Sequence, residues 1–214
     1  MTTQPPSSET VPAEVFDAVA LAHDHMRWDR EPGTFDASVL EVLEGIAASR
    51  RGKALFLGCG SGREAASFSA NGWDCVLVDY SPTMLELARE RLGTNGIEFV
   101  LTSVDEYLDT LDDRFDFVSM VGEVLGYVPD PPALLAAAAS VVDSLGVLIV
   151  TWADADRLGV GTLRGDVASF HEKGDLHISA WTAEIYGRWA LAAGLAVGTE
   201  LGAYSESPRR CWIH

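Results

Sequence analysis

Apolar positions recur with helical spacing in the first part of the chain. Two stretches show this period, residues 13–22 and 34–48, and a period near 3.6 residues is typical of an amphipathic helix. One face of the second stretch carries Phe35, Val39, Val42, Leu43 and Ile46. The run between them, 23–30, is polar and aromatic without a period. The pattern therefore predicts two N-terminal helices joined by a loop.

After residue 50, short apolar runs alternate with helical patterns. Strands are predicted over 53–57, 74–78, 96–101, 115–121 and 147–152, with two closing strands over 195–201 and 210–213. Helices are predicted over 63–70, 82–92, 132–145 and 182–193. Parallel strands need crossover connections, which are right-handed. We therefore expect an α/β fold: a doubly wound, mostly parallel seven-stranded sheet with helices on both faces and an antiparallel pair at its C-terminal end.

The length of 214 residues favours a single domain over 13–214. Residues 1–12 are polar and rich in Pro and Ser, which predicts a mobile tail. Residues 154–181 break the alternation with scattered glycines and charges that follow no period. We interpret this segment as an excursion over the active face.

Charge, hydropathy and cysteine content limit the classes of partner and location that the sequence allows. Thirty-two acidic residues against fifteen Lys and Arg give a net charge of −17, which repels phosphate backbones and disfavours nucleic acid. No segment approaches the roughly 18 to 20 uninterrupted apolar residues of a membrane span. The cysteines, Cys59, Cys75 and Cys211, are odd in number and have no metal-ligand spacing, so we expect a reducing, cytoplasmic location and no metal site.

A glycine loop follows the first predicted strand. Gly58, Gly60 and Gly62 allow a tight turn and a close approach of backbone N–H groups to a ligand. Asp79 ends the next strand, where its carboxylate can accept hydrogen bonds from a ribose diol. The pair indicates a nucleoside site. Nicotinamide dinucleotide sites place an acid in the same way, so this spacing alone does not name the nucleoside.

Two sequence runs carry a resemblance to a known family. Residues 57–64, Leu-Gly-Cys-Gly-Ser-Gly-Arg-Glu, and 78–85, Val-Asp-Tyr-Ser-Pro-Thr-Met-Leu, closely resemble the first two motifs of class I S-adenosylmethionine-dependent methyltransferases. The likeness extends from about residue 52 to the end of the chain. It implies a Rossmann-like fold, S-adenosylmethionine as cofactor and S-adenosylhomocysteine as product. It also implies that residues 13–50 form a lid.

The resemblance assigns cofactor contacts by position. The glycine loop, with Cys59, would carry the methionine half, and Asp79 would bind the ribose. The other implied contacts are Tyr80 and Met84 near the adenine, Ser103 and Val104 at its edge, and Val121 through its backbone. Two positions depart from the family pattern: Ser103 stands where an acid is usual, which gives Asp105 a substitute role, and Phe56 stands where an acid often precedes the glycines.

Methyl transfer to a hydroxyl or a protonated amine needs a base but no covalent enzyme nucleophile. The loop after the fourth strand brings Glu123 and Tyr127 beside the reactive end of the cofactor, as the resemblance implies. His171 and His177 lie in the excursion, which in this family often carries acceptor-binding residues. Each of these residues also has a purely structural interpretation. Glu123 could be an acid at a helix start, where the helix dipole favours it, Tyr127 a half-buried aromatic residue, and the two histidines solvent-facing side chains.

We therefore expect a methyltransferase that acts on an O or N atom of a small-molecule metabolite. The alternatives are a cyclisation that uses the same cofactor, an NAD(P)-dependent oxidoreductase, and methylation of a macromolecule. The expected partner is the small-molecule acceptor, neither nucleic acid nor a membrane, with a homodimer left open.

Overall fold

The computed structural model describes residues 12–29, 31–158, 168–172, 176–196, 198–201, 207 and 209–214. Of the predicted tail, only Pro12 lies among them. A seven-stranded sheet has the order β3-β2-β1-β4-β5-β9-β8. Its strands are β1 Lys53–Leu57, β2 Asp74–Asp79, β3 Ile97–Leu101, β4 Phe115–Met120, β5 Val142–Ala153, β8 Thr199–Leu201 and β9 Arg209–Ile213. β1 to β5 pair in parallel, whereas β9 is antiparallel to both β5 and β8. The predicted fold class is confirmed.

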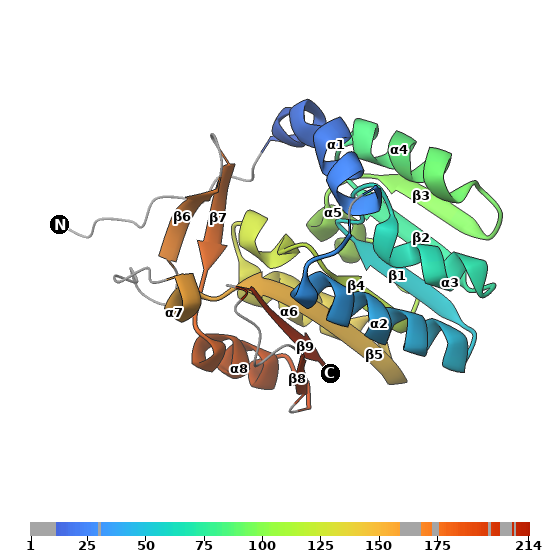
Figure 1. Cartoon of the computed structure of the whole chain (residues 1–214). Coiled ribbons are helices and arrows are strands. Elements are labelled where there is room, and N and C mark those ends of the chain that lie inside the picture. The colour runs from blue at the N-terminus through green and yellow to red at the C-terminus, as the bar shows by residue number, and fades with distance from the viewer. Residues whose placement is uncertain are drawn as a thin grey trace.

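Helices cover both faces of this sheet (Figure 1). They are α1 Ala13–Trp28, α2 Thr34–Ser49, η1 Arg63–Ala65, α3 Ala66–Ala70, α4 Pro82–Leu92, α5 Val104–Asp109, η2 Val124–Tyr127, α6 Pro131–Ser140, α7 Ala155–Leu158 and α8 Ala183–Ala192. Successive residues of β1 alternate between two cores. Ala54 and Phe56 pack with α2, α3 and α4, while Leu55 and Leu57 pack with α5, α6 and α8. Burial on both faces explains why the strand reads as a continuous apolar run.

The predicted loop over 23–30 is wrong for residues 23–28, because α1 continues through Trp28. The polar residues of this run have tertiary partners. Asp24, only 6% exposed, accepts hydrogen bonds from the Arg91 guanidinium, and the Trp28 indole N–H donates to Ser61. Charged and aromatic side chains that would suit a loop are here used to hold a helix against the domain.

The predicted helix over 132–145 is also too long, since α6 ends at Ser140 and β5 begins at Val142. The start of β4 holds this backbone: Phe115 N donates to the Val141 carbonyl, and the Arg114 guanidinium donates to the carbonyls of Ser140 and Val142. Tertiary pairing overrides the helical preference of the sequence here. The short helix α5, which the pattern missed, is capped by Ser103.

The segment after β5 contains more regular structure than its sequence indicates. α7 follows β5 directly, and β6 Ala168–Glu172 pairs with β7 Leu176–Ala180 in a separate antiparallel sheet. β7 packs on η2 so closely that a Cβ on Gly126 would lie 2.8 Å from Ile178 Cγ2. The hairpin thus borders the loop that follows β4. Within the described part of the chain, no helix is long and apolar enough to cross a membrane.

Candidate active site

A cavity of about 660 Å³ lies beyond the carboxyl ends of β1, β2 and β4. Residues directly after each of these strands form its floor, and Phe16, Val19, His23 and Met26 of α1 form its roof. Open α/β sheets bind ligands at this edge, where neighbouring crossovers diverge. The cavity size also lies within the range of small-molecule and cofactor sites, about 300 to 1,000 Å³.

The glycine loop follows β1 at the floor of the cavity. Gly58 has φ +64°, and a Cβ there would lie 2.7 Å from Val124 Cγ2. Gly60 has φ +52° and faces open space bounded by His23. Gly62 has φ +81° and fits against Leu92 of α4 instead of lining the cavity. The glycines therefore serve two purposes, exposing the loop backbone and packing it against its neighbours.

Asp79 ends β2 beside this loop. Its Oδ2 accepts the Gly60 N–H at 2.8 Å, and its Oδ1 accepts the Ser81 N–H at 2.9 Å. The residue is only 6% exposed, and burial raises the pKa of the carboxyl group although these backbone donors oppose that shift. Each oxygen keeps a further lone pair for a ligand. The carboxylate is thus fixed in orientation at the cavity floor.

The region beyond Asp79 is lined by both apolar and polar residues. Tyr80, Met84, Ser103 and Val104, the residues predicted to contact the adenine, all line it, and their contact with a cofactor stays a prediction. The Ser103 hydroxyl oxygen accepts the Glu106 N–H at 3.4 Å as the N-cap of α5, which leaves its hydrogen to donate. Asp105 also lines the cavity, whereas Phe56 lies in the core against Phe68 and Phe117.

Helix α1 closes the cavity from above and is held to the domain along its length. The Asp17 carboxylate accepts hydrogen bonds from the Ser81 hydroxyl and from Thr83 N. Near the other end, Arg91 Nη2 lies 2.7 Å from Asp24 Oδ2. Next to the Asp17 anchor, the Phe16 ring meets Tyr80 and Tyr127 edge-on, at centroid distances of 5.5 and 5.2 Å.

Glu123 stands at the other end of the cavity, on the loop after β4. Its backbone adopts φ 59° and ψ 29°, a left-handed conformation that is uncommon for a side chain of this type. The N–H groups of Gly122 and Glu123 donate to Thr151 Oγ1 at 2.9 and 3.2 Å, which holds the loop in place. Backbone strain of this kind often marks a functional site. Val121 and Tyr127 line the same end.

Arg209 and Asp36 complete this end, and neither was expected there. Arg209 Nη1 lies 3.1 Å from Asp36 Oδ1 and 3.9 Å from Glu123 Oε1. The sequence indicates only a charged strand end at Arg209. The partner Asp36 lies 173 positions away, so no local pattern could have joined them.

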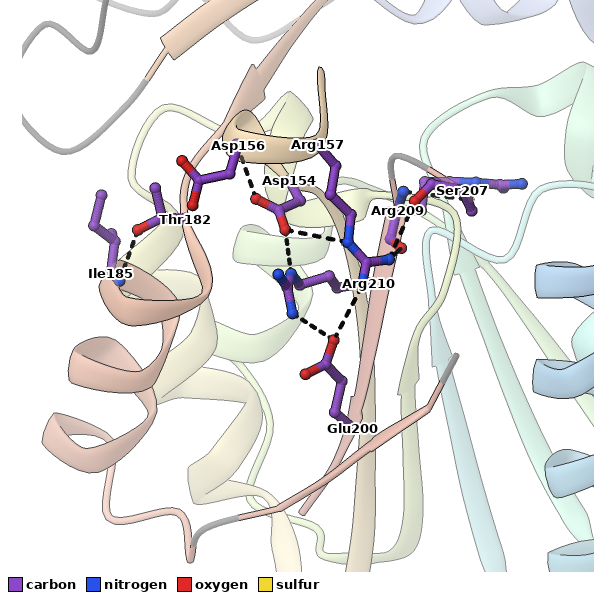
Figure 2. Close-up of polar contacts among 9 residues, drawn as sticks. All are labelled: Asp154, Asp156, Arg157, Thr182, Ile185, Glu200, Ser207, Arg209 and Arg210. Carbon is purple, nitrogen blue, oxygen red and sulfur yellow. Dashed lines mark hydrogen bonds and ion pairs between the residues drawn. The ribbon is translucent and has the colours of Figure 1, made fainter. Parts of the chain in front are cut away.

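Figure 2 shows what fixes the backbone of Arg209. Asp154 is completely buried and binds the Arg210 guanidinium, which also contacts Glu200. Arg157 Nη1 donates to the carbonyls of Ser207 and Arg209, at 3.2 and 3.4 Å. The network thus ties α7 to β9 and positions the residue whose side chain reaches the cavity.

The structure describes the side chains of some histidines but not of the two predicted catalytic ones. His171 and His177 are register partners across β6 and β7, and their side chains lie outside the described residues. Their catalytic role stays a prediction. His23 lines the cavity, while His25 pairs with Asp29 on the surface. Among the described side chains, no group of three or more His, Cys, Asp or Glu is arranged to hold a metal ion.

Comparisons with known proteins bear on this site. Residues 55–150 match the model of a methyltransferase domain. A ubiquinone biosynthesis O-methyltransferase of Thiobacillus denitrificans is 34% identical over 92 residues, which cover 42% of this chain and 39% of that protein. The chain thus spans well under half the length of this curated relative. The residues that match the domain model include the glycine loop, Asp79 and Glu123.

Solved structures extend the likeness over nearly the whole chain. An S-adenosylmethionine-dependent methyltransferase from Clostridium acetobutylicum has a TM-score of 0.67 at 14% identity, covering 90% of this chain and 96% of that one. CalS10, an amino pentose methyltransferase from Micromonospora echinaspora solved with S-adenosylmethionine bound, has a TM-score of 0.64 at 18% identity, covering 96% and 98%. At these identities the likeness concerns the fold.

Proposed function

We propose that this chain, which belongs to the class I S-adenosylmethionine-dependent methyltransferase family, methylates an O or N atom of a small molecule. One observation carries the proposal. Asp79, buried and oriented by two backbone donors, lies beside a glycine loop at the floor of a cavity large enough for a nucleoside cofactor. This is the arrangement that a ribose diol and an adjoining chain of polar groups require.

The lining residues fit S-adenosylmethionine part by part. Asp79 would accept the ribose hydroxyls, and Tyr80, Met84 and Val104 would surround the adenine. The ring edge would meet the Ser103 hydroxyl and the adjoining backbone. The glycine loop, open above Gly60, would take the methionine half. These assignments leave the end of the cavity near Glu123 for the acceptor.

The cofactor supplies a methyl group on a sulfonium, ready for in-line displacement. The protein has to align the acceptor and exclude water. Helix α1 and the Phe16 ring cover the cavity, and the β6–β7 hairpin borders its acceptor end through Ile178. Glu123, held rigidly at that end, is the group that we assign to take the acceptor's proton, with Tyr127 beside it.

The acceptor space is bounded by α1, the loop after β4 and the hairpin, which favours a small molecule over a polymer. The net charge of −17 argues in the same direction against nucleic acid. The three cysteines are all buried free thiols, in keeping with a reducing cytoplasm. We accordingly propose a cytoplasmic enzyme, acting as a monomer or a homodimer.

Calorimetric titration with S-adenosylmethionine tests the cofactor assignment. Asp79→Ala removes the charged acceptor of two hydroxyls and should weaken binding roughly 10- to 100-fold, corresponding to about 1 to 3 kcal/mol. Asp74→Ala is the matched control, because Asp74 is an exposed aspartate at the opposite end of the same strand. No binding to the wild type, or equal affinities for all three proteins, would refute the assignment.

Product analysis separates methyl transfer from cyclisation of the same cofactor. Incubation with a panel of small hydroxyl and amine compounds should yield S-adenosylhomocysteine together with a methylated compound. Formation of methylthioadenosine in its place would show the cyclising chemistry.

A further inference from the structure

His23 lies on α1 directly above the glycine loop. A Cβ built on Gly60 would have one neighbouring heavy atom within 4 Å among the described residues, His23 Cε1 at 3.8 Å. His23 also lines the cavity. A ligand group resting on the Gly60 backbone would therefore lie against the imidazole ring.

The helix that carries His23 is held in place on both sides of this residue's turn. Asp24, the next residue, is paired with Arg91 at 2.7 Å. One turn further on, the Trp28 indole N–H donates to Ser61 Oγ at 3.1 Å and lies 3.3 Å from the Ser61 carbonyl. Ser61 adjoins Gly60, so the helix and the glycine loop are joined next to the gap that separates His23 from the loop.

The position of Asp79 indicates which part of a nucleoside ligand would lie between His23 and the glycine loop. Its Oδ2 binds Gly60 N, so a ribose held by this carboxylate lies at the edge of the loop. The substituent on that ribose would then lie over the loop, beneath His23. In S-adenosylmethionine this substituent ends in an amino acid with a carboxylate. An imidazole carries an N–H in either tautomer and can donate it to such a group.

We infer that His23 is a cofactor-binding residue that donates a hydrogen bond to the carboxylate of the methionine moiety. This inference rests on the proposed function, since it needs the cofactor in the cavity. It makes α1 part of the cofactor site as well as its cover. It also predicts that His23 distinguishes the complete cofactor from a truncated nucleoside.

Two thioether ligands isolate this contact: S-adenosylhomocysteine, which keeps the amino acid, and 5′-methylthioadenosine, which lacks it. His23→Ala should weaken S-adenosylhomocysteine about tenfold, as expected for a charge-assisted hydrogen bond, and change 5′-methylthioadenosine less than about twofold. His23→Gln, which keeps an N–H donor, should recover part of the loss. His25→Ala is the control, since His25 lies on the same helix with a side chain 59% exposed.

Failure of this inference and failure of the proposed function would give different results. Equal weakening of both ligands by His23→Ala would show a structural effect on α1 and overturn the inference, as would unchanged affinity for S-adenosylhomocysteine. Failure of the wild type to bind either ligand would instead refute the proposed function. Circular dichroism of each variant checks that α1 and the domain remain folded.

Discussion

The two ends of the cavity are built in different ways. The end that we assign to the cofactor comes from consecutive pieces of chain, a glycine loop after β1 and Asp79 at the end of β2, joined by backbone hydrogen bonds. The end that we assign to the acceptor combines Asp36, Glu123 and Arg209 from three distant segments, joined by side-chain charges. Backbone geometry defines the first end, and long-range ion pairs define the second.

This difference implies that mutations should act separately on the two ends. A change in the glycine loop or at Asp79 should alter cofactor affinity. A change at Asp36, Glu123 or Arg209 should leave the cofactor affinity intact, unless it also disturbs the buried network around Asp154 that Figure 2 shows. Four predictions test this separation.

Arg210→Met should have the largest effect on stability. It leaves the completely buried Asp154 with the Asp156 N–H and with the more distant Arg157 guanidinium, whose Nε lies 3.7 Å away. Breaking a buried ion pair costs about 3 to 5 kcal/mol of unfolding free energy. Urea denaturation measures this loss, with Arg89→Met, which breaks an exposed pair with Glu86, as the control. Equal losses in the two variants would contradict the assigned role of the network.

Gly58→Ala should lower the free energy of unfolding by about 2 to 5 kcal/mol, the sum of a left-handed backbone penalty and an overpacking cost. The added Cβ would lie 2.7 Å from Val124 Cγ2. Gly93→Ala is a matched control, because Gly93 has φ +72° but no heavy atom within 4 Å of a built Cβ. Denaturation of both variants separates the clash from the backbone term. Similar losses would mean that Val124 moves aside without cost.

The pH dependence of cofactor binding should report on Asp79. Burial raises the pKa of this carboxyl. It therefore protonates at a higher pH than an ordinary aspartate, whose pKa is about 3.9. Protonation removes the charged acceptor, and cofactor affinity should fall as pH decreases through the raised pKa. For the ligand-free protein the sign is opposite: the stability linked to this raised pKa is lost as pH rises through it.

Calorimetry and denaturation over a pH series that begins near the ordinary aspartate pKa, about 3.9, and rises to neutral pH, with Asp79→Asn beside the wild type, measure the two trends. Asp79→Asn should flatten both. An affinity that falls with the same slope in the variant would assign the pH dependence to another group.

Arg209→Met should have the smallest effect on stability, below about 1 kcal/mol, since its pair with Asp36 is partly exposed. Affinity for S-adenosylhomocysteine should stay within about twofold of the wild type, whereas methyl transfer to any accepted compound should slow about tenfold as alignment is lost. Calorimetry and turnover measurements check both parts. A large loss of cofactor affinity would show that the two ends are coupled.

The sequence was most informative where structure is local. The bounds of β1 to β4, the helix over 82–92 and the position of the glycine loop beside Asp79 depend on neighbouring residues, and the sequence predicted them to within one residue. Helix α1 beyond residue 22 and the early end of α6 depend on tertiary partners such as Arg91 and Arg114, which no window of sequence contains. The role of Arg209 also depends on tertiary partners, because a charge at a strand end does not indicate which residues its side chain reaches.

A crystal structure with S-adenosylhomocysteine tests the central claim most directly. It should show both ribose hydroxyls donating to Asp79, the adenine near Tyr80 and Val104, and the sulfur directed toward the end of the cavity that holds Glu123 and Arg209. A ligand bound away from Asp79, or a sulfur directed away from Glu123, would contradict the proposed division of the cavity.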